Sequence, residues 1–103
     1  MYFNHEKLMC YSVALGIARW AADLRVPTAR RHLKDQLVRA ADGVVLSIAE
    51  GCGRPHGGAA RRNFFDIAMG SAAEVGAIID LLGADADKKR DALRVVQMAA
   101  KLR

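Results

Sequence analysis

Apolar residues recur every three or four positions in four segments of the chain, which is the period of one face of an α-helix. The four segments cover residues 5–24, 29–50, 59–82 and 86–102. Between them stand Pro27, the glycine-rich loop 52–58 and Gly83, which are residue types that end helices and form turns. The pattern therefore predicts four α-helices, with Gly51 suited to the left-handed position that closes the second one.

Length and composition favour an all-α fold. The chain has 103 residues, enough for a single domain over 1–103, and 52% of them are hydrophobic although only 6% are aromatic. A β-sandwich would need more aromatic and β-branched residues. Short connections make consecutive helices antiparallel neighbours, so we predict an up-down-up-down four-helix bundle.

The first segment is apolar over more of its surface than one core seam requires. It carries two adjoining stripes, Leu8, Tyr11, Leu15, Ala18 and Ala22, and Val13, Ile17, Trp20 and Leu24. We expect this helix to contact another subunit as well as its own core.

The second segment contains a charged and small-residue face that needs an explanation. Arg39, Gly43, Ser47 and Glu50 follow one another at spacings of four, four and three, so they share one side of the helix. A hairpin turning near residues 56–57 would place Gly43 opposite Gly70 and Arg39 level with Glu74. We interpret these residues as structural, with the two glycines allowing close approach and the two charges forming a cross-helix ion pair. Loss of one partner from a buried pair costs about 3–5 kcal/mol.

Catalytic and metal-binding interpretations find little support in the spacing. Di-iron bundles need Glu-x-x-His on two helices, whereas Glu50 and Glu74 are followed at the third position by Gly53 and Ala77. The serines and cysteines have no nearby histidine to act as a base. We predict a protein that is not an enzyme and has no catalytic residue, metal or cofactor.

Cysteine content and hydropathy bear on the compartment. Cys10 and Cys52 lack metal-type spacing and fit free thiols in a reducing cytoplasm. No apolar run reaches the length of about 18 residues that a membrane span needs, so we expect no membrane association.

The charge is basic, and its placement is unusual. The net charge is +5 and the isoelectric point is about 9.7. Cations stand at helix starts, where the helix dipole disfavours them but where free N–H groups can bind phosphate. In an up-down bundle one end would carry Arg30, Arg31, Lys34, Lys88, Lys89 and Arg90, and the other Arg54, Arg61 and Arg62. The alternative is that these are ordinary solvated charges.

Two motifs resemble the family of 23S rRNA intervening-sequence proteins, over about residues 36–75. The family pattern is Gln-x-x-Arg-Ala, Asn-Ile-Ala-Glu-Gly, a loop arginine and then Ala-x-Gly-Ser-x-x-Glu. The matching positions are Gln36, Arg39, Ala40, Ile48, Ala49, Glu50, Gly51, Arg54, Ala68, Gly70, Ser71 and Glu74. The chain departs from the pattern at Gly43, where the family usually has serine, and at Ser47, where it has asparagine.

The resemblance implies a left-handed four-helix bundle that assembles as a homopentamer. A similar bundle serves as the accessory variability determinant of diversity-generating retroelements, a basic pentamer that binds nucleic acid and a reverse transcriptase. Five copies of this chain would carry five times the charge of +5. We therefore expect a homo-oligomer that binds RNA or DNA through phosphates, and a nucleic-acid-processing protein is a further expected partner. The alternative is a scaffold that recruits another protein without touching nucleic acid.

Overall fold

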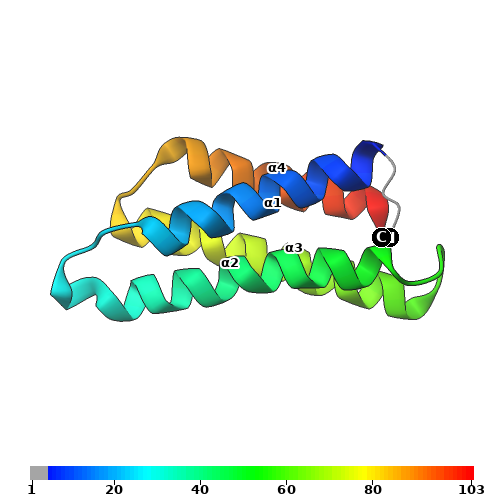
Figure 1. The fold of residues 1–103 in the computed structure, drawn as a ribbon, viewed down its shortest axis with the longest axis horizontal. Helices are drawn as coiled ribbons and strands as arrows, with labels where there is room; N and C mark the ends of the chain where they lie inside the picture. Colours follow the sequence, from blue (N-terminus) through cyan, green and yellow to red (C-terminus); the bar gives the residue numbers. More distant parts are fainter. Residues whose placement is uncertain (1–4) are drawn as a thin grey trace.

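The computed structural model describes the backbone of residues 5–103 and the side chains from Glu6 onward. It contains α1 (His5–Asp23), a 3₁₀ turn η1 (Thr28–Arg30), α2 (Arg31–Cys52), α3 (Ala59–Leu82) and α4 (Ala86–Leu102) (Figure 1). The described part of the chain holds no β-strand, which confirms the predicted all-α class.

The helix boundaries differ from the predicted ranges mainly in α2. The 3₁₀ turn occupies its expected first residues, and the helix continues to Cys52 instead of stopping at Glu50. The expectation of a left-handed Gly51 is wrong, because Gly51 is a buried residue inside the helix. A β-carbon there would lie only 2.9 Å from Cε2 of Phe65, so the glycine provides room for a ring of α3 and not for a turn.

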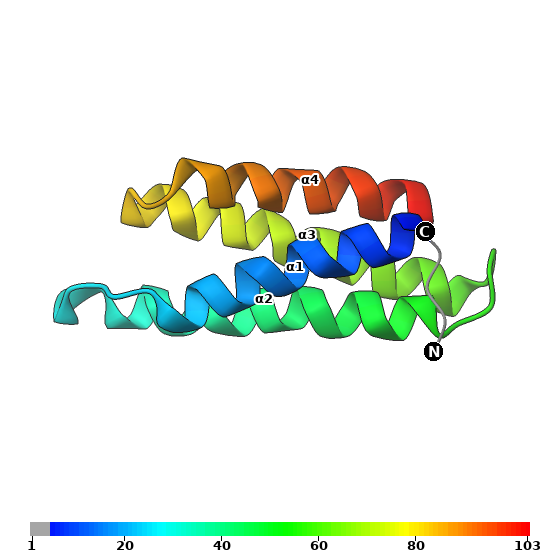
Figure 2. The same cartoon turned by 45° about the horizontal axis from the view of Figure 1, so that its top comes forward.

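Consecutive helices run antiparallel, and the molecule is elongated, with extents of 43 × 21 × 20 Å (Figures 1 and 2). α1 packs against α2 and α4, and α3 packs against the same two helices, so α1 and α3 occupy diagonal corners of the bundle. The α1–α2 and α3–α4 connections lie at one end, and the α2–α3 loop lies at the other. The left-handed twist stays a prediction.

Small side chains fill much of the core. In the described residues, nine of the 21 buried hydrophobic residues are alanines, and the larger ones include Leu37, Ile48, Phe65 and Ile79. Alanine-rich seams let helix backbones approach closely, which explains how a chain with few aromatic residues packs four helices.

The helix starts differ in how their free N–H groups are satisfied. Asp85 caps α4, because its carboxylate accepts hydrogen bonds from the N–H groups of Asp87 at 2.9 Å and Lys88 at 3.3 Å. α2 and α3 have no side-chain cap and no acidic residue in the first turn. The N-terminal amides of α2 and α3 therefore remain without an anionic group from their own chain.

Candidate nucleic-acid interface

The motif residues of the central hairpin do not form the predicted ion pair. Arg39 and Glu74 are both exposed, and no ion pair joins them within the described part of the chain. They stand on the outer side of their helices, where each is solvated separately. The cost of about 3–5 kcal/mol expected for losing one partner therefore does not apply to the single chain, because neither charge is buried.

The predicted contact between Gly43 and Gly70 is also wrong. A β-carbon on Gly43 would meet Oγ of Ser71 at 3.7 Å, whereas one on Gly70 would meet nothing within 4 Å. The pairing of the two helices is shifted by one residue, and one residue turns a helix by about 100°, which moves Gly70 to the surface. Close packing of the hairpin comes from other motif residues, since Ser47 and Gly51 are buried.

The polar motif residues Gln36 and Glu50 lie at the surface, whereas Ala40, Ile48 and Ala68 are buried. Both polar residues are exposed, and Glu50 forms an ion pair of 3.4 Å with Arg54, which lies in the loop after α2. Such a pair contributes little to stability. The motif thus divides into a packed set and an exposed set.

Arg61 was predicted to contact phosphate, but its side chain lies in the core. Only 2% of the residue is exposed, its Nε donates a hydrogen bond of 2.9 Å to the carbonyl of Leu102, and its guanidinium lies 5.1 Å from the centre of the Phe65 ring. The carbonyl end of α4 carries partial negative charge, which attracts this cation from the start of α3. No signal in the sequence predicts this bond, because the helical period alone assigns Arg61 to a first turn.

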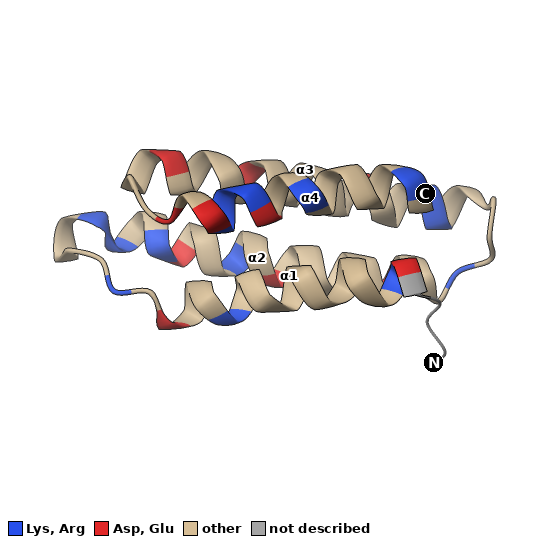
Figure 3. Cartoon of the chain, turned by 90° about the horizontal axis from the view of Figure 1, so that it is seen from above, with Lys and Arg blue, Asp and Glu red and all other residues tan. Residues whose placement is uncertain are grey.

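The cations at the start of α4 are matched by carboxylates. Lys89 pairs with Asp80 at 2.7 Å, and Arg90 pairs with Asp87. Lys88 lies 3.8 Å from Asp91. The starts of α2 and α4 do lie at one end of the bundle, as expected, but the α4 half of that end is close to electrically neutral (Figure 3).

At the loop end of the bundle one exposed arginine is paired with a carboxylate, and another, among the described residues, bonds only a backbone carbonyl. Arg54 pairs with Glu50 and lies 5.4 Å from the centre of the Phe64 ring. The guanidinium of Arg62 donates to the carbonyl of Gly57 at 2.8 Å.

Arg103 closes the C-terminal end of α4 onto α3. Its guanidinium donates two hydrogen bonds to the carboxylate of Asp66, at 2.6 and 2.9 Å, and this pairing lowers the pKa of Asp66 below its ordinary value of 3.8. The same end of α4 accepts the hydrogen bond from Arg61.

One cluster of cations remains uncompensated. We name it the α1–α2 corner, and it consists of Arg25, Arg30, Arg31 and Lys34. The three arginines are exposed, and Lys34 donates to the carbonyl of Ala22 at 3.2 Å. In the described part of the chain none of the four forms an ion pair with a carboxylate. Figure 3 shows that this end of α2 is mainly basic, whereas the start of α4 carries charges of both signs.

Sequence reasoning missed Arg25, because it considered cations at helix starts and in the glycine-rich loop but not in the linker around Pro27. Arg25 lies in the linker between α1 and η1, and it lines a shallow hollow together with Leu24, Val26, Arg31 and Lys34. The sequence did contain a signal for Arg25. The chain reverses direction at Pro27, and this reversal brings a cation of the linker to the same corner as the basic start of α2.

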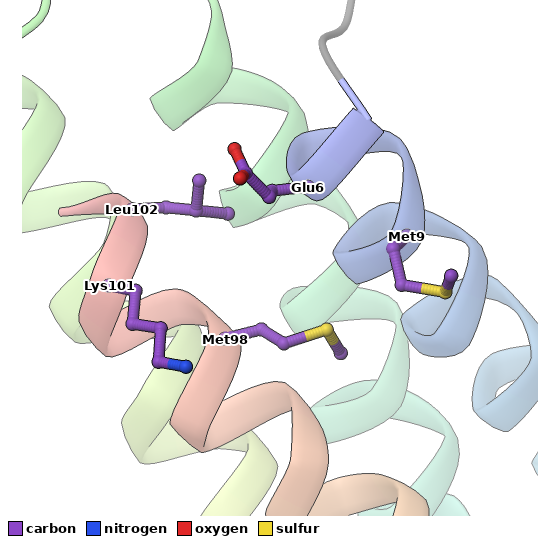
Figure 4. A pocket seen from close by; sticks show the side chains of 5 residues that line it. All are labelled: Glu6, Met9, Met98, Lys101 and Leu102. Atoms are coloured by element: carbon purple, nitrogen blue, oxygen red, sulfur yellow. The ribbon is translucent and has the colours of Figure 1, made fainter.

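The other concave regions show no arrangement of reactive groups. The hollow between the start of α1 and the end of α4 is lined by Glu6, Met9, Met98, Lys101 and Leu102 (Figure 4). Its surface is mostly apolar and brings together no nucleophile and base. Within residues 5–103 no three histidine, cysteine or carboxylate residues are grouped so that they would hold a metal ion.

Both cysteines are free, and their surroundings disfavour the thiolate form. Burial raises the pKa of Cys10 to about 11, with a smaller contribution from the neighbouring Cys52. Burial also raises the pKa of Cys52, although Lys7 and Arg61 oppose the change. At neutral pH both groups are therefore mainly thiols, which are weak nucleophiles.

A helix that crosses a bilayer must be both long and apolar. None of the helices in the described chain combines the length and the apolar character needed to cross a membrane.

Comparison with known proteins gives one family. Residues 6–101 match the family described as 23S rRNA-intervening sequence protein, so the match extends over nearly the whole chain. The searches of curated proteins and of solved structures found no match.

Proposed function

The chain belongs to the 23S rRNA-intervening sequence protein family, and from this premise we propose that it is a non-enzymatic, homo-oligomeric bundle that binds RNA or another nucleic acid through backbone phosphates. The observation that supports the proposal best is the α1–α2 corner, whose four cations have no acidic partner in the described chain. Two acids, Asp23 and Asp35, are near in sequence, but neither pairs with a cation of the corner.

Phosphate is the group that this corner suits. Arginine presents several N–H donors in a planar fork that matches phosphate oxygens. The start of α2 has no side-chain cap and adds the positive end of a helix dipole, although the N–H of Arg31 already donates to the carbonyl of Thr28 in the preceding 3₁₀ turn. The start of α4 is a poorer site, because Asp85 already occupies its N–H groups.

The expected binding mode does not read sequence. In the part of the chain that the structure describes no Phe, Tyr or Trp side chain is exposed, so that part of the surface offers no platform of these rings for stacking bases. Contacts with phosphates position a protein on nucleic acid and make the affinity strongly dependent on salt.

Assembly increases the effect of a small cluster. A homopentamer, as the family resemblance implies, would carry five copies of the α1–α2 corner, and a ring whose axis runs parallel to the helices would place them all on one rim. Several weak contacts on one RNA then act together, which raises the overall affinity without any new contact. The proposed compartment is the cytoplasm, where a protein of nucleic-acid processing would be a suitable second partner.

A comparison of two triple variants tests the proposal with equal changes of net charge. Arg30→Gln/Arg31→Gln/Lys34→Gln removes cations of the corner, and Lys88→Gln/Lys89→Gln/Arg90→Gln removes the same number at the start of α4. Binding to a structured RNA is measured by filter binding at several salt concentrations. We expect the corner variant to bind at least tenfold more weakly, and the slope of log K against log salt to fall by about 0.7–0.9 for each phosphate that is no longer bound.

The α4 variant is the control for net charge, because its lysines and arginine are already paired with carboxylates. Equal reductions of affinity in the two variants would show that only the total charge matters and would refute the assignment to the corner. Absence of binding by the unmodified protein at low salt would refute the nucleic-acid proposal itself.

A second candidate function is a scaffold for another protein. Leu46 on α2 favours it, because this large apolar residue is 66% exposed and borders a groove lined by Leu15, Ala18 and Val45. Capture of a partner from lysate that persists after nuclease treatment and is abolished by Leu46→Asp would support the scaffold, and release of the partner on nuclease treatment would support the nucleic-acid proposal.

A further inference from the structure

The outer face of α3 is an apolar stripe with one charge. We name it the α3 stripe, and it consists of Ile67, Gly70, Glu74, Ala77 and Leu81, all of them exposed. The exposed fractions of Ile67 and Leu81 are 45% and 60%, which is high for aliphatic side chains. The alternating spacing of three and four residues is that of the seam between packed parallel helices, and the small residues allow close approach.

The outer face of α1 is a second surface of the same kind. We name it the α1 stripe, and it consists of Leu8, Ser12, Leu15, Gly16 and Arg19. Leu8 is 51% exposed, and Gly16 has no neighbour within 4 Å of the position of a β-carbon. Arg19 is exposed and forms no ion pair in the described chain, which is also true of Glu74 on the α3 stripe.

The two unpaired charges stand at nearly the same height along the bundle. Leu15 and Ala18 of α1 line one groove with Asp42 and Val45 of α2, so residue 17 of α1 is close to the level of residue 43. Gly43 in turn faces Ser71 of α3.

Residue 17 of α1 is therefore level with residue 71 of α3. Because α1 and α3 run in the same direction (Figure 1), this offset in residue number holds along both helices. Residue 19 of α1 is then level with about residue 73 of α3, next to Glu74. By the same offset Leu15 is level with residue 69, next to Gly70, and Ser12 with residue 66, next to Ile67.

We propose that the α3 stripe docks on the α1 stripe of a second copy of this chain, with the helices parallel and with Glu74 paired to Arg19 of that copy. The inference rests on the proposed homo-oligomer and states which faces form its interface. Rotation about an axis parallel to the helices keeps every copy at the same height. Because Glu74 and Arg19 lie at nearly the same height within one chain, Glu74 of one copy comes level with Arg19 of the next.

The position of the two stripes is compatible with a closed ring. They belong to diagonal helices, so the contact is head-to-tail and not self-complementary. Both stripes lean toward α2, because Leu15 borders the groove with Val45, and Ser71, next to the α3 stripe, faces Gly43. The two docking faces are therefore not diametrically opposed, and successive copies turn in one sense, whereas opposed faces would give a straight filament.

A two-fold dimer through the α3 stripe alone is disfavoured by its charge. Glu74 is the central residue of the stripe, so two α3 helices packed face to face would bring two carboxylates together. Like charges facing each other across an interface cost free energy and are a device against wrong pairing.

Charge exchange tests the pairing by light scattering coupled to size-exclusion chromatography on the full chain. We expect the unmodified protein to be larger than the single-chain mass of 11.2 kDa. Glu74→Arg and Arg19→Glu should each raise the dissociation constant of the assembly at least tenfold, and the double variant Arg19→Glu/Glu74→Arg should restore the mass of the unmodified protein. Circular dichroism of each variant tests whether its helices are retained.

The matched control is Arg39→Glu/Glu74→Arg, because Arg39 is the other exposed, unpaired arginine considered as a partner of Glu74. Restoration by this pair and not by the pair with residue 19 would overturn the proposed interface while leaving a homo-oligomer. Failure of the Arg19→Glu/Glu74→Arg variant to reassemble would also overturn it. A single-chain mass for the unmodified protein at all concentrations would refute the homo-oligomer as well, and the RNA titration of the triple variants would still decide the phosphate proposal.

Discussion

Replacement of Arg61 by methionine is predicted to destabilise the bundle far more than the same change at its neighbour, Arg62. The two arginines are adjacent at the start of α3, but Arg61 is 2% exposed and Arg62 is at the surface. Methionine keeps most of the apolar stem of Arg61, so the substitution removes the guanidinium and leaves only a small cavity.

The magnitude follows from the contacts of the Arg61 guanidinium. A charge-assisted hydrogen bond such as that to the carbonyl of Leu102, at 2.9 Å, contributes about 1.5–3 kcal/mol. The guanidinium over the Phe65 ring, at 5.1 Å, adds about 0.5–2 kcal/mol. Relief of the cost of burying a charge offsets part of this sum, so we expect a net destabilisation of about 2 kcal/mol for Arg61→Met. Arg61→Ala adds an unfilled cavity and should cost about 4 kcal/mol.

Thermal unfolding followed by circular dichroism measures the effect. For a chain of this size each kcal/mol shifts the Tm by about 4–8 °C, so Arg61→Met should melt roughly 8–16 °C below the unmodified protein. Arg62→Met should lie within about 0.5 kcal/mol of it, as expected for an exposed position. Equal melting temperatures for the two variants would refute the conclusion that the buried guanidinium holds the end of α4 on α3.

Two further predictions concern packing and pH. Gly51→Ala should destabilise by about 1–3 kcal/mol in urea unfolding, because its β-carbon would lie 2.9 Å from a ring carbon of Phe65. Gly76→Ala should instead stabilise by about 0.5–1 kcal/mol, because a β-carbon there meets nothing within 4 Å and alanine is the better helix former; similar effects at the two positions would contradict the packing explanation. Asp66→Asn should lower stability at pH 6 but not at pH 2, because a carboxyl whose pKa is lowered by Arg103 stabilises the fold above its ordinary pKa of 3.8 and loses that effect as pH falls through the lower folded value. An equal difference between Asp66→Asn and the unmodified protein at both pH values would exclude the ion pair as the cause.

The sequence determined the helices with little error, because their signals are local. The apolar period, Pro27 and Gly83 act within one or two turns of the chain, and Gly83 indeed takes the left-handed conformation, with φ of 63°, that ends α3. The expected end of α2 was wrong, because Gly51 lies inside the helix, where its missing β-carbon gives room to the Phe65 ring of another helix.

The pairing of charges was decided only by the tertiary structure, because it depends on which residues of distant segments come level. One residue of register separates the observed contact between Gly43 and Ser71 from the expected one with Gly70, and no local signal is precise enough to fix it. The sequence alone determined that this chain is a basic, alanine-rich four-helix bundle. The tertiary structure decided which of its cations are buried, paired or left exposed, because burial and ion pairing arise between helices, and the helical period describes each helix by itself.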